Sequence, residues 1–162
     1  MDDMKRSLLV LLDRFDTGML CTRQPDGTMR ARPMALAQVE ESGDLWFVTG
    51  VGSGKVEEVL NDPHVVVTFQ GRKQFASISG RAEIVGDEER IEALWRDEWG
   101  EWFPQGKDDP RLALLHVRAT EAEWWDESVA RGAKHALDAA KAALSGKQRR
   151  GDEEREHGHL ML

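Results

Sequence analysis

The sequence predicts a mainly β protein, a closed antiparallel β-barrel with peripheral helices. Its apolar residues fall into short runs separated by Gly, Pro, Asp and Ser turn signals, which is typical of antiparallel strands. The runs do not alternate with helical patterns, so a parallel βαβ sheet is not expected. The chain has 162 residues, 40% of them hydrophobic, with six Trp and five Phe. This is enough apolar material for one folded core.

One helix and then three strands are expected in the first part of the chain. The helix follows from apolar residues at spacings of three and four, with an acidic residue before it as a cap. The strands follow from apolar runs joined by the Pro-Asp-Gly-Thr and Glu-Ser-Gly-Asp turns. The expected elements are the helix 3–15 and the strands 19–23, 29–39 and 45–49.

Two helices and three strands are expected in the second part. Alternation in residues 75–85 places Ala76, Ile78 and Gly80 on one face and serines on the other. Residues 119–126 end the regular body. The expected elements are the helices 53–61 and 87–103 and the strands 64–69, 75–85 and 112–117. The helix 87–103 carries an apolar flank that we assign to the core or to a dimer interface: Ile91, Leu94, Trp95, Trp99 and Trp102.

The composition changes after residue 126, which sets the expected domain boundaries. No Trp or Phe occurs beyond it. We expect a barrel domain over 1–126, a helical extension over 127–145 that is rich in Ala, and a charged, disordered tail over 146–162.

Charge and composition exclude several classes of protein. The net charge of -8 disfavours a general nucleic-acid binder. The longest aliphatic run, residues 8–12, is far shorter than the roughly 20 residues that span a bilayer, and the acidic residues beside it do not fit a signal peptide. Cys21 is the only cysteine, so no intrachain disulfide or cysteine-based zinc site is possible. We expect a cytoplasmic protein.

The most informative motif is a strand that runs through a glycine-rich turn into a helix. Residues 50–54 read Gly-Val-Gly-Ser-Gly, and Lys55 follows at once. A helix start offers free N–H groups and a positive dipole end, and here a hydroxyl from Ser53 and an ammonium from Lys55 stand beside them. This pattern predicts a binding site for one phosphate. In an equally open interpretation, Ser53 is only a helix cap and Lys55 is only a solvated charge. The spacing fits neither a P-loop nor a dinucleotide-binding motif.

Two arginines two residues apart form a second candidate. Arg30 and Arg32 share one face of the expected strand 29–39. They either form salt bridges with the surplus of Asp and Glu, or one of them assists Lys55 on a phosphate.

The remaining titratable residues give weaker signals. We interpret His64 and His116 as structural, and His157 with His159 as a weak hint of a metal site. The pair Glu57 and Glu58 is expected on a solvated helix face. The chain contains no Tyr. The protein itself therefore offers little acid-base machinery, and a bound cofactor would have to supply the chemistry.

Several short motifs, taken together in order, carry a resemblance to a known family. They are Ala31-Arg32-Pro33-Met34, Leu45 to Gly50 followed by Ser53-Gly54-Lys55-Val56, Asn61 to Val65, Ser77 to Glu83, Trp102 to Gly106, Asp108 to Leu112, and Glu123-Trp124-Trp125-Asp126. The chain resembles the FMN-binding split-barrel superfamily of pyridoxamine 5'-phosphate oxidase, and within it the bacterial general stress protein branch.

This resemblance implies a six-stranded antiparallel Greek-key split barrel that forms a homodimer, with FMN in each of two clefts between the subunits. It also implies which residues contact the cofactor. Arg32 is the flavin-strand arginine, and the phosphate pattern falls on Ser53 and Lys55, with Arg30 or Arg32 compensating for an arginine that is Gly54 here. The other residues implied near the ring are Pro33, Met34, Val48, Thr49, Phe75 and Trp125.

The same resemblance limits the expected activity. The vitamin B6 oxidases bind their substrate with an Arg-x-His-x-Arg motif. Only the first arginine of that motif has a counterpart in this chain, Arg131, so oxidation of pyridoxamine phosphate is not expected. The resemblance implies an FMN-dependent oxidoreductase linked to stress response. The alternatives are a non-catalytic flavin-binding stress module, or the same barrel holding a deazaflavin, FAD or haem.

Overall fold

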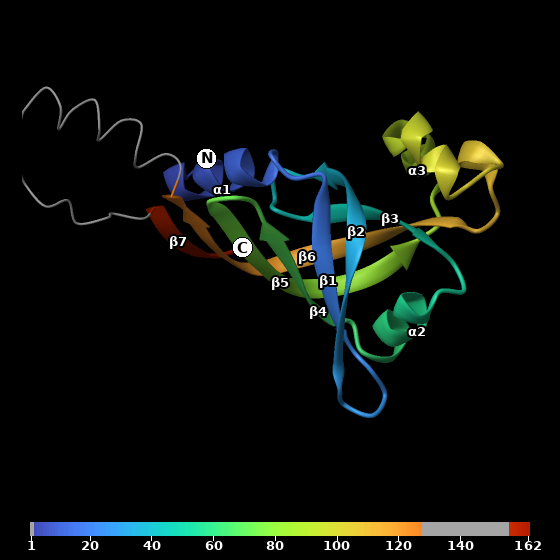
Figure 1. Cartoon of the computed structure of the whole chain (residues 1–162), viewed down its shortest axis with the longest axis horizontal. Helices are drawn as coiled ribbons and strands as arrows, with labels where there is room; N and C mark the ends of the chain where they lie inside the picture. The colour runs from blue at the N-terminus through green and yellow to red at the C-terminus, as the bar shows by residue number, and fades with distance from the viewer. Residues whose placement is uncertain (1, 128–155) are drawn as a thin grey trace, which may run out of the picture.

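A computed structural model describes residues 2–127 and 156–162 (Figure 1). Three α-helices and seven strands are present in these residues, with two short 3₁₀ segments. In chain order they are α1 (Asp3–Leu12), β1 (Thr17–Arg23), β2 (Met29–Val39), β3 (Leu45–Gly50), α2 (Gly54–Asn61), β4 (His64–Gln70), β5 (Gln74–Val85), α3 (Glu88–Leu94), η1 (Asp97–Glu101), η2 (Gly106–Asp108), β6 (Leu112–Asp126) and β7 (Glu156–Met161). No helix among the described residues is both long and apolar enough to cross a membrane.

Six strands close into an antiparallel barrel, which confirms the predicted fold class. Their order is β3-β2-β1-β4-β5-β6, and β3 pairs with β6 to complete the circle. The strand β6 is one continuous element of 15 residues, where the sequence suggested a strand over 112–117 alone. Its first half closes the barrel on β3, and its second half pairs with β7.

The barrel interior holds the main hydrophobic core. The predicted alternation in β5 is confirmed, because Ala76 and Ile78 are buried in this core. The helix α1 closes one end of the barrel with Leu8, Leu11 and Leu12, which are at most 2% exposed. Full burial of such side chains contributes about 1.5–3 kcal/mol each, so the barrel and α1 form one folding unit.

The expected helix 87–103 is wrong as a continuous element. The helix α3 ends at Leu94, and Trp95 is extended before the 3₁₀ segment η1 begins. Packing explains the break, because Trp99 and Phe103 cover the outer face of β3 and β6 in a second apolar cluster and are 2% and 8% exposed. Trp102, which an unbroken helix would place on the same flank, is 57% exposed.

The prediction of a disordered tail over 146–162 is wrong for its last residues. Residues 156–161 form β7, which pairs with β6 from Glu121↔Met161 to Asp126↔Glu156. Pairing to an open strand edge supplies backbone hydrogen bonds that the composition of the tail does not reveal. The helix expected at 127–145, apart from its first residue, and the tail up to residue 155 lie outside the described residues.

Candidate functional site

The glycine-rich turn between β3 and α2 builds the centre of the candidate site. Gly52 has a φ of 81°, a conformation that glycine adopts without strain. Ser53 is the N-cap of α2, yet its side chain makes no capping hydrogen bond. Among the described residues its Oγ is buried without any hydrogen-bond partner. Val56 N–H donates to the Ser53 carbonyl, but no side chain caps the first N–H groups of α2, and the Ser53 hydroxyl is unused. This arrangement is suited to an anion.

Lys55 adds a cation to this turn. Its side chain is half-buried, and burial together with the nearby charge of Arg32 lowers the pKa of its ammonium. No carboxylate in the described part of the chain forms an ion pair with it. Lys55 is therefore partly shielded from solvent and lies close to a second cation, Arg32.

Arg30 and Arg32 both bind one buried carboxylate, that of Glu58 on α2. Arg32 Nη2 donates to Glu58 Oε2 at 2.5 Å, and Arg30 Nη1 lies 3.3 Å from Glu58 Oε1. The hydroxyl of Thr22 on β1 also donates to Glu58 and accepts from Arg32. The salt-bridge interpretation of the two arginines is therefore confirmed, and the acidic partner is a residue of the same site.

The prediction that Glu58 lies on a solvated helix face is wrong. Only 6% of the residue is exposed, whereas its neighbour Glu57 is exposed as expected. The hydrogen bond from Thr22 is the largest cause of a lowered pKa for Glu58, and together with the contacts of Arg32 and Arg30 it outweighs the opposing effect of burial. The carboxylate thus stays ionised and ties α2 to β1 and β2. No local signal in the sequence separates Glu58 from Glu57, since each stands beside a buried valine, Val59 or Val56.

The charges of Arg30, Arg32, Lys55 and Glu58 do not balance one another. Arg30, Arg32 and Lys55 carry three positive charges, and Glu58 supplies one negative charge. Arg32 keeps its Nε–H and one hydrogen on Nη2 unassigned, since the contacts found in the described residues use only three of its five donors. The surplus of two positive charges suits a phosphate monoester, which carries about -1.5 to -2 at pH 7.

Four other predicted residues lie on β2 and β3 near this turn, in different environments. Thr49 is 3% exposed, and its Oγ1 is a second buried hydroxyl that no described group satisfies. Pro33 is exposed. The side chains of Met34 and Val48 are buried in the two apolar clusters, so only their backbone is available to a ligand.

The structure does not bring Phe75 and Trp125 to the glycine-rich turn of the same chain. They pair across β5 and β6 at the end of the sheet next to β7, away from α2 (Figure 1). Six residues of β5, about 20 Å at the usual rise per residue, separate Phe75 from Arg81, which pairs with His64 just after α2. A single chain therefore holds two separate halves of the predicted residue set.

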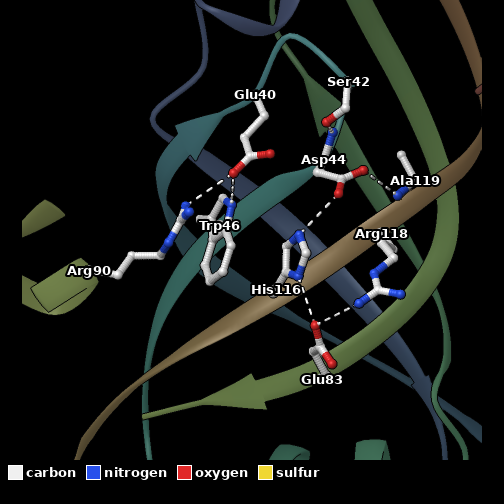
Figure 2. A network of polar contacts seen from close by, with 9 residues as sticks. All are labelled: Glu40, Ser42, Asp44, Trp46, Glu83, Arg90, His116, Arg118 and Ala119. Atoms are coloured by element: carbon white, nitrogen blue, oxygen red, sulfur yellow. Dashed lines mark hydrogen bonds and ion pairs between the residues drawn. The ribbon is translucent and has the colours of Figure 1, made fainter. Parts of the chain in front are cut away.

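His116 and His64 serve structural contacts. Figure 2 shows His116 between Asp44 and Glu83, with its ring nitrogens 3.1 Å and 3.0 Å from their carboxylate oxygens. His64 contacts Asp62 and Arg81, so the structural interpretation of both is confirmed. No cluster of metal-binding side chains occurs in the described ranges.

Comparison with known families decides the classification. The model of the family described as pyridoxamine 5'-phosphate oxidase like matches residues 3–150. The chain belongs to this family. The predicted family is thereby confirmed, and the oxidase-like barrel agrees with the strand order described above.

Solved structures of general stress proteins share the oxidase-like fold. A candidate general stress protein 26 from Jannaschia sp. CCS1 aligns over 100% of both chains with a TM-score of 0.76 and 24% identity. The general stress FMN/FAD binding protein of Xanthomonas citri has a TM-score of 0.63 and 31% identity, covering 76% of this chain and 87% of that one.

A curated relative is the protein bli-3 of Neurospora crassa, 31% identical over 118 residues, or 65% of this chain. The chain spans 56% of the length of that relative.

Proposed function

We propose that this member of the oxidase-like family is a homodimeric flavoprotein that binds FMN in two clefts between its subunits. The phosphate is held by Ser53, Lys55 and the start of α2, with Arg32 beside them. The main observation in support of this phosphate site is the half-buried Lys55 next to the buried, unpartnered hydroxyl of Ser53. A buried hydroxyl without a partner costs free energy unless a ligand completes its hydrogen bond.

The separation of the two halves of the site supports the proposed dimer. Thr49 and Lys55 lie at one end of the sheet and Phe75 and Trp125 at the other. A second copy turned end for end supplies its Phe75 and Trp125 to the cofactor that the first copy holds by its phosphate. The X. citri relative is described as binding FMN or FAD, which supports a flavin as the ligand.

The proposed activity is that of an oxidoreductase. The flavin, when bound, supplies hydride transfer, and the residues of this chain bind and orient it. Arg32 presents its remaining N–H donors toward the cofactor, because Glu58 and Thr22 fix its guanidinium. Lys55 and the N–H groups of α2 neutralise the phosphate.

The direct test is titration of the purified, full-length protein with FMN, riboflavin and FAD, followed by gel filtration and a visible spectrum. We expect FMN to bind at least tenfold more tightly than riboflavin, because only FMN carries the phosphate. We also expect the flavin band to elute at the volume of two chains. Equal affinity for FMN and riboflavin would contradict the phosphate site, and a flavin-loaded single chain would contradict the dimer.

Turnover is tested by the same preparation. If the protein is an oxidoreductase, NADH or NADPH reduces the bound flavin and oxygen or a second acceptor reoxidises it. A flavin that stays oxidised with both nucleotides would favour the non-catalytic stress module instead.

A further inference from the structure

The strand β7 has a fixed register on β6, set by Gly158. A Cβ at this position would collide with the indole of Trp124, which is 2% exposed. A slip of one residue would place a histidine on that indole and turn every side chain to the other face. Gly158 therefore fixes both His157 and His159 on the outer face of the sheet.

His157 meets Trp125 on this outer face. The two rings are stacked with centroids 5.2 Å apart and planes 8° apart. Trp125 also lies directly opposite Phe75 on β5, which is 36% exposed. Three rings from β5, β6 and β7 thus form a row, and His157 stands at its end.

A carboxylate orients the His157 ring. Its Nε2 lies 2.8 Å from Glu123 Oε1. A carboxylate only accepts hydrogen bonds, so Nε2 carries the hydrogen, and Nδ1 of the neutral ring is left as an acceptor. No hydrogen bond to Nδ1 is found among the described residues.

His159 provides a built-in comparison. It lies on the same strand and face, and its Nε2 is 2.6 Å from Glu121 Oε1. The side chains of His157 and His159 are 50% and 52% exposed. The difference between them is the ring contact, because His159 stacks on no aromatic ring among the described residues.

We propose that His157 is a positioning residue of the flavin site. By stacking on Trp125 it fixes the plane in which this indole meets the isoalloxazine ring of the FMN held by a second copy. The inference rests on the proposed function, because that function places Trp125 beside the flavin. The inference gives the C-terminal strand β7 a role in the proposed cleft, at the end that holds the isoalloxazine ring.

The experiment compares full-length His157→Ala, His157→Phe and His159→Ala with the wild-type protein. Each is titrated with FMN, and the visible spectrum of the bound flavin is recorded. We expect His157→Ala to weaken FMN binding by about two- to tenfold, the usual range for one aromatic stacking contact, and to change the shape of the flavin band. His157→Phe keeps a planar ring on Trp125 and restores both. His159→Ala matches the wild type.

Each other outcome overturns the inference. A wild-type affinity and spectrum in His157→Ala means that the stack does not position Trp125. Equal losses in His157→Ala and His159→Ala mean that β7 acts only through its stability, and failure of His157→Phe means that the Glu123 contact matters instead. If the wild-type protein itself retains no FMN, the proposed function fails and this inference with it. If the wild type retains FMN, only this inference is at stake.

Discussion

Two clusters of charged residues on the barrel differ in how completely they are paired. In the cluster shown in Figure 2, which we call the His116 network, three carboxylates face three basic side chains: Glu40, Asp44 and Glu83 against Arg90, His116 and Arg118. In the cluster around Glu58, Arg30 and Arg32 share one carboxylate, and Lys55 near Arg32 adds a third positive charge without an ion pair among the described residues. The first is balanced when His116 is protonated, and the second keeps a surplus of two positive charges.

The difference also extends to the neighbouring rings and hydroxyls. Trp46 lies between the His116 ring, 4.0 Å away, and the Arg90 guanidinium, 4.1 Å away, and its Nε1 donates to Glu40. Near the glycine-rich turn, by contrast, the hydroxyls of Thr49 and Ser53 are buried without partners in the described structure. A complete network stabilises the fold, whereas an incomplete one indicates a ligand site. Four predictions test this contrast.

The largest effect is expected from Glu58→Gln. This change removes the one anion that Arg32 and Thr22 share in a buried setting, and breaking such a pair costs about 3 kcal/mol of unfolding free energy. Urea denaturation of the cofactor-free protein measures the loss. Glu57→Gln is the matched control, with the same change at an exposed neighbour and an expected effect within about 0.5 kcal/mol. Similar values for the two variants would show that Glu58 does not hold α2 to the barrel.

Lys55→Ala is expected to reduce FMN affinity and leave stability nearly unchanged. The variant loses one charge-assisted contact, worth about 1.5–3 kcal/mol, or roughly 10- to 150-fold in Kd. Fluorescence titration with FMN measures the affinity. The control is Lys107→Ala, since Lys107 is exposed and paired with Glu92. An unchanged Kd in Lys55→Ala would remove Lys55 from the phosphate site.

His116→Gln is expected to show the opposite pattern. It loses the ring stack on Trp46 and one of the two contacts with Asp44 and Glu83, so unfolding free energy falls by about 1–2 kcal/mol. FMN affinity stays at the wild-type value. A weaker FMN affinity would mean that the His116 network also serves the ligand site, and the contrast between the two clusters would be lost.

The smallest effect on stability is expected from lowering the pH. Thr22, Arg32 and Arg30 lower the pKa of Glu58, and His116 lowers that of Glu83, in both cases against the effect of burial. A carboxyl whose pKa is lower in the folded state stabilises the protein above its ordinary pKa of 4.5, and this stabilisation is lost as the pH falls through the folded value. Stability should therefore decline below about pH 4.5.

Variants separate the two contributions to this acid sensitivity. Glu58→Gln should flatten the dependence of unfolding free energy on pH more than Glu83→Gln, because the side chain of Glu58 is 8% exposed and that of Glu83 is 52% exposed. Denaturation midpoints measured from pH 3 to 7, about the range in which carboxyls titrate, provide the comparison. If Glu83→Gln flattens the pH dependence more than Glu58→Gln does, the His116 network contributes more to the acid sensitivity than the cluster around Glu58.

Local patterns were sufficient to predict most of the barrel. The strand 75–85, with Ala76 and Ile78 inward, is confirmed because period-two alternation depends only on which face is buried. The motif around Ser53 and Lys55 could be recognised in the same way, since both residues belong to one turn and the helix that follows it.

Three features could not be predicted because they depend on residues far apart in the chain. The burial of Glu58 on α2 requires Thr22 and Arg32 from two strands, β1 and β2. The break at Trp95 is set by the outer face of β3 and β6. The strand β7 requires the open edge of β6 and the indole of Trp124, against which only Gly158 fits.

The sequence by itself determined the barrel class and the glycine-rich turn that we propose to bind phosphate, because both arise from side-chain periodicity and backbone preferences over a few consecutive residues. Only the tertiary structure decided which charges are neutralised and which remain available. Ion pairing is set by distances between elements, and a Glu with two nearby arginines looks the same in sequence whether it is solvated or buried. The surplus charge beside Lys55 and the position of His157 on Trp125 both belong to this second kind of information.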